Sequence, residues 1–126
     1  MQNDPLAELT GYVCPDCGGA LSKRDGANGT RGNGQGEYRC RIGHTFTPAQ
    51  LWIKTCAMRN RALGAAARAV AETVDLARAL AAEARATGNE PLAARLESDA
   101  QSEERYIGLL LQMLEDLVAD EPDARP

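Results

Sequence analysis

Three cysteines and the single histidine of this chain lie in two short segments. Cys14 and Cys17 form a CxxC motif followed by two glycines, and Cys40 and His44 form a second pair with three residues between them. Thiolate sulfurs and imidazole nitrogens are the ligands that zinc prefers, and a tight CxxC turn lets two sulfurs hold one tetrahedral ion. The 22 residues between Cys17 and Cys40 suit a hairpin that returns to complete a Cys3His site. The sequence therefore predicts one zinc ion per chain, bound by Cys14, Cys17, Cys40 and His44.

The predicted zinc ion has a structural role. Residues 11–47 offer few groups for a hydrophobic core, namely Tyr12, Val13, Leu21, Tyr38, Ile42 and Phe46. So small a segment cannot bury enough apolar surface to fold unaided. Zinc binding contributes roughly 10–16 kcal/mol in small modules, which makes up the deficit. Four protein ligands leave no position for water or substrate, so we expect no chemistry at the ion.

Three alternatives to this ligand set remain open. The CxxC motif is also found in redox proteins, but there it begins a helix within a βαβ pattern, and here glycines and a loop follow. His44 is alternatively a turn residue, with three thiolates and a water around the ion. Cys56, inside the following helix, is either a small buried thiol of the core or a ligand in place of His44.

The composition changes near Thr47, which divides the chain into two modules. We expect a mainly α fold, in which a small β zinc ribbon with two knuckles and a short hairpin occupies residues 11–47. Its strands are expected at about 20–23 and 37–41, and the turn signals Asp25-Gly26 and Asn28-Gly29 lie between them. A long antiparallel helical hairpin follows over residues 48–119. Residues 1–10 and 120–126 are expected to form flexible tails.

The start of the first helix is marked by several local signals. Thr47 is a suitable N-cap, Pro48 suits the first helical position, and Gln50 completes a capping box. Phe46 before the cap and Leu51 after it can form a hydrophobic staple. The sequence therefore predicts that a helix begins directly after the second zinc knuckle.

The link between the two helices is equally well marked. We expect the first helix to run to about Thr87 and Gly88 to end it. Asn89 can cap a second helix, with Pro91 in its first turn, that runs to about Ala119. So short a break forces the helices to fold back on each other as an antiparallel pair.

Both helices have an apolar face at helical spacing. The predicted core face of the first helix comprises Leu51, Trp52, Met58, Ala62, Leu63, Ala66, Ala69, Val70, Thr73, Leu76 and Leu80. That of the second comprises Leu92, Leu96, Ala100, Tyr106, Ile107, Leu110, Met113, Leu114 and Leu117. The first helix is basic near its start and the second is acidic near its end. When the two helices fold back at Gly88, Arg61 and Glu115 are equally far from the turn and are therefore expected to lie opposite each other.

The hairpin is the expected contact surface for a partner. Two helices that bury one face each form a marginal core, so we expect either dimerisation into a four-helix bundle or docking onto another protein. A monomeric hairpin with solvated outer faces is the alternative.

Charge and composition limit the other partners. The net charge is -4, which opposes broad binding to nucleic-acid phosphates. The bases Lys23, Arg24, Arg31, Arg39 and Arg41 are balanced by an equal number of acids in residues 1–47. The N-terminus lacks the features of a signal peptide, and no apolar stretch is long enough to span a membrane. We therefore expect a cytoplasmic protein with reduced thiols and no membrane partner.

Two quoted segments carry a resemblance to a known family. YVCPDCGGAL, followed by YRCRIGHTFTPAQL and an Ala-, Arg-, Leu- and Glu-rich helical region, resembles the C-terminal extension of some bacterial chemotaxis-type protein-glutamate methylesterases. The resemblance covers residues 11 to about 117 and implies the same four ligand positions. It also implies a role in chemosensory signal transduction. The methylesterase activity is not expected, because the chain has no GxSxG nucleophile elbow and its only histidine is assigned to the metal.

These observations favour a non-catalytic zinc-binding module for protein–protein interaction or regulation in chemosensory-type signalling. The alternative is a zinc-ribbon protein that binds nucleic acid or takes part in transcription.

Overall fold

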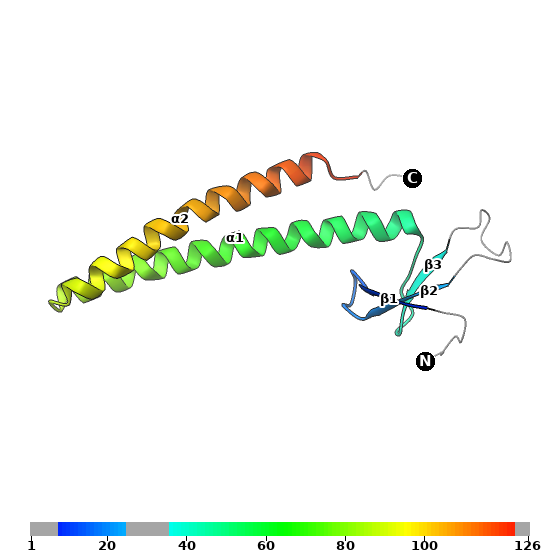
Figure 1. The fold of residues 1–126 in the computed structure, drawn as a ribbon, viewed down its shortest axis with the longest axis horizontal. Coiled ribbons are helices and arrows are strands. Elements are labelled where there is room, and N and C mark those ends of the chain that lie inside the picture. The colour runs from blue at the N-terminus through cyan, green and yellow to red at the C-terminus, as the bar shows by residue number, and fades with distance from the viewer. Residues whose placement is uncertain (1–7, 25–35, 123–126) are drawn as a thin grey trace. The chain divides into compact units, whose positions relative to one another are not determined.

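The computed structural model describes residues 8–24 and 36–122. It contains, in order, β1 (Glu8–Val13), β2 (Ala20–Arg24), β3 (Glu37–Cys40), β4 (Thr45–Phe46), α1 (Pro48–Ala86) and α2 (Glu90–Ala119). A small antiparallel sheet is thus followed by two long helices that pack as a hairpin (Figure 1), which confirms the predicted mainly α fold. Neither helix has a stretch long and apolar enough to cross a membrane.

The sheet is a four-stranded meander in the order β1-β2-β3-β4. Leu21 pairs with Cys40 between β2 and β3, and Tyr38 pairs with Phe46 between β3 and β4. The core beneath the sheet contains the buried side chains Cys14, Leu21, Cys40 and Phe46, with Tyr38 and Leu51 packed against them. Two of the four buried groups are thus predicted metal ligands, so the metal site is part of the core of this module.

Two of the four strands lie where the sequence predicted them, and the other two, β1 and β4, were not predicted. β2 and β3 match the expected hairpin strands to within one residue at each end. The tail expected over residues 1–10 is wrong for residues 8–10, because β1 begins at Glu8 and pairs with β2. Gly11, with φ +80°, interrupts the pairing between Leu9 and Val13, which explains why the local pattern did not indicate a strand. The turn signals Asp25-Gly26 and Asn28-Gly29, and the remaining tail residues 1–7 and 123–126, lie outside the described residues.

The N-terminus of α1 has the predicted capping box. The Thr47 backbone N–H donates to the side-chain oxygen of Gln50 at 3.0 Å, and the Gln50 backbone N–H donates to the Thr47 hydroxyl at 3.2 Å. Pro48 is the first helical residue. Leu51 packs against the core cluster that contains Phe46, as the staple requires.

The link between α1 and α2 is a Schellman turn followed by an N-cap. The Asn89 N–H donates to the carbonyl of Ala84 at 2.7 Å and the Gly88 N–H to that of Arg85 at 3.2 Å. Gly88 has φ +80°, a conformation that favours glycine at this position. The Asn89 side chain then accepts a hydrogen bond from the Leu92 N–H, which starts α2 as predicted.

From Asn60 onward the buried and half-buried positions of the two helices, apart from Gly64 and Ala71, alternate at spacings of three and four, as in a coiled coil. We define the seam as these positions. In α1 they are Asn60, Leu63, Ala67, Val70, Val74, Ala77, Ala81 and Ala84, and in α2 they are Ala93, Leu96, Ala100, Glu103, Ile107, Leu110, Leu114 and Leu117. Many are alanines, so the two backbones can approach closely.

The predicted core face of α1 is largely wrong. Only Leu63 and Val70 of the predicted residues beyond Met58 lie in the seam, whereas Ala62, Ala66, Ala69, Thr73, Leu76 and Leu80 are exposed. In α2 the exposed members of the predicted face are Leu92, Tyr106 and Met113. Alanine occurs on nearly every side of α1, so apolar spacing alone did not distinguish the seam from the outer face.

Ion pairs and one hydroxyl contact fix the register of the hairpin. The guanidinium of Arg85 lies 2.6 Å from a carboxylate oxygen of Glu97, and the guanidinium of Arg78 lies 2.7 Å from a carboxylate oxygen of Glu104. The Thr73 hydroxyl donates to Glu103 at 2.6 Å, and these two residues are equally far along the chain from Gly88, as reflection predicts. The expected partners Arg61 and Glu115, both described, form no ion pair with each other.

The chain divides into two compact units inside α1, between Met58 and Arg59. The predicted boundary was at the start of this helix. The first turns of α1 therefore belong to the same unit as the sheet, and the hairpin seam belongs to the second.

Candidate metal centre

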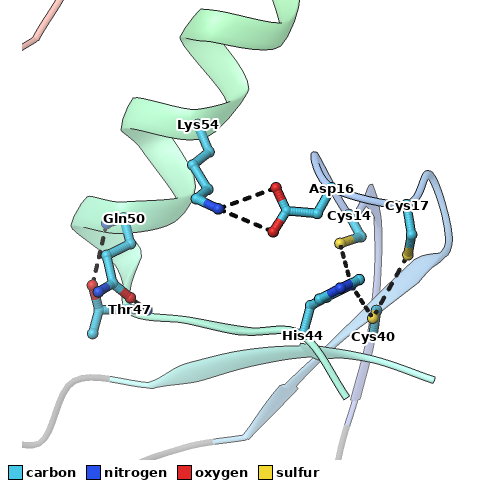
Figure 2. Close-up of polar contacts among 8 residues, drawn as sticks. All are labelled: Cys14, Asp16, Cys17, Cys40, His44, Thr47, Gln50 and Lys54. Carbon is cyan, nitrogen blue, oxygen red and sulfur yellow. Dashed lines mark hydrogen bonds and ion pairs between the residues drawn. The ribbon is translucent and has the colours of Figure 1, made fainter. Parts of the chain in front are cut away.

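The structure brings the four predicted ligands together at one point (Figure 2). Cys14 follows β1, Cys17 lies in the turn after it, Cys40 ends β3, and His44 directly precedes β4. The sulfur atoms and a ring nitrogen of these residues all lie within 4.8 Å of one another. Cys14 and Cys40 are buried, His44 is half-buried and Cys17 is exposed, so one side of the cluster faces solvent.

Three of the six distances within the cluster are close to the edges of a tetrahedron around zinc. The Sγ atoms of Cys17 and Cys40 are 3.7 Å apart, and the His44 Nδ1 lies 3.6 Å from the Cys14 Sγ and 3.4 Å from the Cys40 Sγ. Zinc–sulfur bonds of about 2.3 Å and zinc–nitrogen bonds of about 2.0 Å at tetrahedral angles imply edges of about 3.8 and 3.5 Å. The donor set and its spacing therefore fit a zinc ion.

The first knuckle is a backbone turn that places two thiols on the same side. The Gly18 N–H donates to the Cys14 carbonyl at 2.8 Å, and the Cys14 N–H donates to the Gly19 carbonyl at 2.7 Å. Gly18 has φ +76°, so a side chain here would be strained. The backbone of Gly19 lowers the pKa of the Cys17 thiol by hydrogen bonding, although other causes outweigh it.

The second knuckle repeats this arrangement around Cys40 and His44. The Cys40 N–H donates to the His44 carbonyl at 3.0 Å, and the Gly43 N–H donates to the Cys40 carbonyl at 3.1 Å. Gly43 has φ +103°, which again favours glycine. The turn brings the imidazole beside the sulfur of Cys40.

The backbone of the second knuckle favours a thiolate at Cys40. Burial raises the pKa of this thiol, but backbone hydrogen bonds from His44 and Ile42 and side-chain hydrogen bonds from Cys17 and His44 outweigh burial and lower the pKa to about 6. At Cys17 the Gly19 backbone hydrogen bond lowers the pKa, whereas burial and the neighbouring thiols Cys14 and Cys40 raise it, and the pKa ends above its usual value. Cys40 is therefore the ligand that is ready to bind a cation at neutral pH.

A charged contact next to the cluster was not predicted from the sequence. The Lys54 ammonium pairs with the carboxylate of Asp16, which lies between Cys14 and Cys17 (Figure 2). The same ammonium lies 5.5 Å from the centroid of the Phe46 ring. No local motif indicates this contact, because it joins positions far apart in the sequence.

Cys56 is buried in α1 and is not part of the cluster. This placement agrees with the interpretation of Cys56 as a small apolar core residue. Among the described residues, one group of side chains could hold a metal ion, and it consists of the four predicted ligands.

No family model, curated protein or solved structure matches this chain.

Proposed function

We propose that this chain is a non-catalytic zinc-binding module that acts through protein–protein contacts in bacterial chemosensory-type signalling. The observation that carries the proposal is the convergence of Cys14, Cys17, Cys40 and His44 within 4.8 Å. Three thiolates and an imidazole form a common structural zinc site, and their spacing is that of zinc ligands.

The proposed zinc has a structural role because the cluster supplies four protein ligands. When bound, it would cross-link the turn after β1 to the segment between β3 and β4. The Cys14 and Cys40 side chains are part of the small core, so the ion would stabilise the same contacts that hold the sheet together. A module with so few large buried side chains gains most of its stability from such a cross-link.

The interaction role is supported by the helices. α1 and α2 expose several large apolar side chains, including Leu76, Leu80, Leu109 and Met113. Exposed apolar surface of this kind is typical of protein contact sites. The chemosensory assignment comes from the resemblance of the two knuckle segments and the following helices to the methylesterase extension.

The zinc part of the proposal is tested by metal analysis of the purified chain after dialysis against metal-free buffer. We expect one zinc per chain. Replacement with cobalt(II) should give the visible absorption bands of tetrahedral thiolate coordination. Addition of azide should leave those bands unchanged, because no ligand position is open. A spectrum that shifts with azide would indicate an open coordination position and would contradict the structural role.

The independence of the two modules is tested by chelation of the metal. Chelation should change the near-UV signal of the sheet module and retain most of the far-UV helical signal of the hairpin. Salt-dependent binding of the zinc-loaded chain to duplex or single-stranded DNA would contradict the proposal and favour the nucleic-acid alternative. A gene neighbourhood that contains chemoreceptors or their kinase would support the chemosensory assignment, and one of transcription genes would oppose it.

A further inference from the structure

Each helix of the hairpin carries a second apolar stripe beside the seam. In α1 it comprises the exposed residues Ala62, Ala66, Ala69, Leu76 and Leu80. In α2 its apolar part comprises Leu92, Tyr106, Leu109 and Met113, whose exposed fractions lie between 44% and 62%, and polar residues occupy the line between Leu92 and Tyr106. Spacings of three, four and seven place each set along one line of its helix. We call the two lines together the outer stripe.

The two lines of the outer stripe lie on the same side of the hairpin. Arg78 and Arg85 each follow a seam residue of α1, and they pair with Glu104 and Glu97, which each follow a seam residue of α2. That side of the seam is therefore the ion-paired side. Ala66 and Leu80 in α1 and Leu92, Tyr106 and Met113 in α2 each precede a seam residue, so they lie on the opposite side.

We propose that a second copy of this chain docks on the outer stripe, with its hairpin antiparallel to the first, to form a four-helix bundle. The proposal rests on the interaction function above and names its partner. The sizes of the side chains along α1 support this occupant. Ala62 and Ala66 make one half of the line small, and Leu76 and Leu80 make the other half large. An antiparallel copy places each leucine against an alanine, as close packing requires.

The charges along the outer stripe are compatible with the same arrangement. Arg59 and Glu83 flank the apolar line of α1. On the line of α2, Asp116 follows Met113, whereas Arg95, Asp99 and Ser102 lie between Leu92 and Tyr106. In an antiparallel copy Arg59 meets Glu83, and Arg95 meets Asp116, each twice by symmetry. The other two-fold arrangement, in which α1 lies on the partner's α2, brings Arg59 near Asp116 and Glu83 near Arg95 in the register set by Thr73 and Glu103. The charges therefore fit both arrangements, and the leucine–alanine complementarity along α1 favours the antiparallel one.

The two charge pairings also agree on one symmetry axis. The midpoint between Arg59 and Glu83 is residue 71, and the midpoint between Arg95 and Asp116 falls next to Tyr106. The hairpin register, in which Thr73 contacts Glu103, places these two midpoints at the same level. A single two-fold axis therefore satisfies both helices.

Sedimentation equilibrium of the full zinc-loaded chain tests the proposal. We expect a dimer, and the double substitution Leu76→Glu/Leu80→Glu should weaken dimerisation by at least about a hundredfold, because four leucines leave the interface. The matched control is Leu111→Glu/Val118→Glu, which changes two similarly exposed residues on the ion-paired side and should leave the dimer intact. A monomeric wild-type chain at about 100 μM would assign the stripe to a different partner and overturn the proposal.

Charge reversal tests the antiparallel geometry. Arg59→Glu and Glu83→Arg should each weaken the dimer by about tenfold or more. An equimolar mixture of the two variants should dimerise again, because the glutamate introduced in one chain then faces the arginine introduced in the other. A mixture that stays monomeric, while both variants keep the helical signal of the wild type, would rule out this pairing. Zinc content is measured in every variant, so loss of the metal function is recognised separately from loss of the dimer.

Discussion

The Lys54 ammonium lies 3.1 and 3.0 Å from the two carboxylate oxygens of Asp16. Asp16 lies between two metal ligands and Lys54 lies in the second turn of α1, so this contact joins the first zinc knuckle to the start of the helix. The capping box of the same helix is formed by Thr47 and Gln50, and Thr47 follows His44 by three residues. The helix start is thus connected to both knuckles, by a side-chain pair on one and by the chain itself on the other.

We expect this ion pair to stabilise the zinc module modestly. Both side chains are partly exposed, at 49% and 36%, so a double-mutant cycle of Lys54→Met and Asp16→Asn should give a coupling free energy of about 0.2–1 kcal/mol that decreases with salt. Arg41→Met, at an exposed basic residue of the same module, is the matched control for loss of one positive charge. A coupling of zero at low salt would mean that the contact has no energetic role.

His44→Ala should lower the affinity for zinc by at least about a hundredfold, because it removes a ligand and not only a residue that orients one. The helical hairpin has its own seam, so most of the far-UV helical signal should remain. Competition with a chromophoric chelator gives the affinity. His44→Cys is the informative companion, since it should recover most of the binding. Unchanged affinity in His44→Ala would remove this residue from the site.

Cys56→Ser should retain one zinc per chain, because Cys56 lies outside the ligand cluster. It should nevertheless lower the free energy of unfolding by about 1–3 kcal/mol, since a hydroxyl replaces a buried thiol. Cys56→Ala separates the cost of polarity from that of lost volume. Metal analysis and thermal unfolding provide the two measurements. Loss of zinc from Cys56→Ser would instead make Cys56 a ligand.

The Arg85–Glu97 pair predicts a specific pH dependence of hairpin stability. A hydrogen bond from Arg85 lowers the pKa of Glu97 below its ordinary value of 4.5. The stabilisation is therefore fully present above pH 4.5 and is lost as the pH falls through the lower pKa of the folded state. Glu97→Gln should lower the Tm by about 1–4 °C at pH 7 and have no effect below the folded-state pKa. Glu115→Gln, which changes a glutamate that forms no ion pair within the described part of the chain, is the control; an equal effect from both substitutions would contradict this cause.

The features that were predicted correctly from the sequence are those set by neighbouring residues. The ligand pairs, the capping box at Thr47 and Gln50, and the turn at Gly88 each depend on a few consecutive positions. Their geometry follows from backbone conformation and side-chain chemistry, so the pattern was sufficient.

The features that were missed depend on contacts between distant segments. β1 is a strand because β2 provides hydrogen bonds to it, although Gly11 interrupts its pattern. The pairing of Asp16 with Lys54 leaves no trace in either local sequence. In α1 the alanine content gives two apolar faces, and only the register against α2 decides that Ala67 and Val74 are buried while Ala66 and Leu76 are not.

The regular seam has a consequence for how such hairpins can diverge in length. Its positions repeat every seven residues in both helices, and the turn at Gly88 closes the pair without reference to its length. Insertion or deletion of seven residues in each helix, at facing sites, would change the hairpin by about 10 Å and preserve the seam, the turn and the metal ligands. An unmatched insertion of three or four residues in α1 between Arg78 and Gly88 would instead shift one helix against the other and separate Arg78 from Glu104. Natural variants of this architecture are therefore expected to differ by paired heptads.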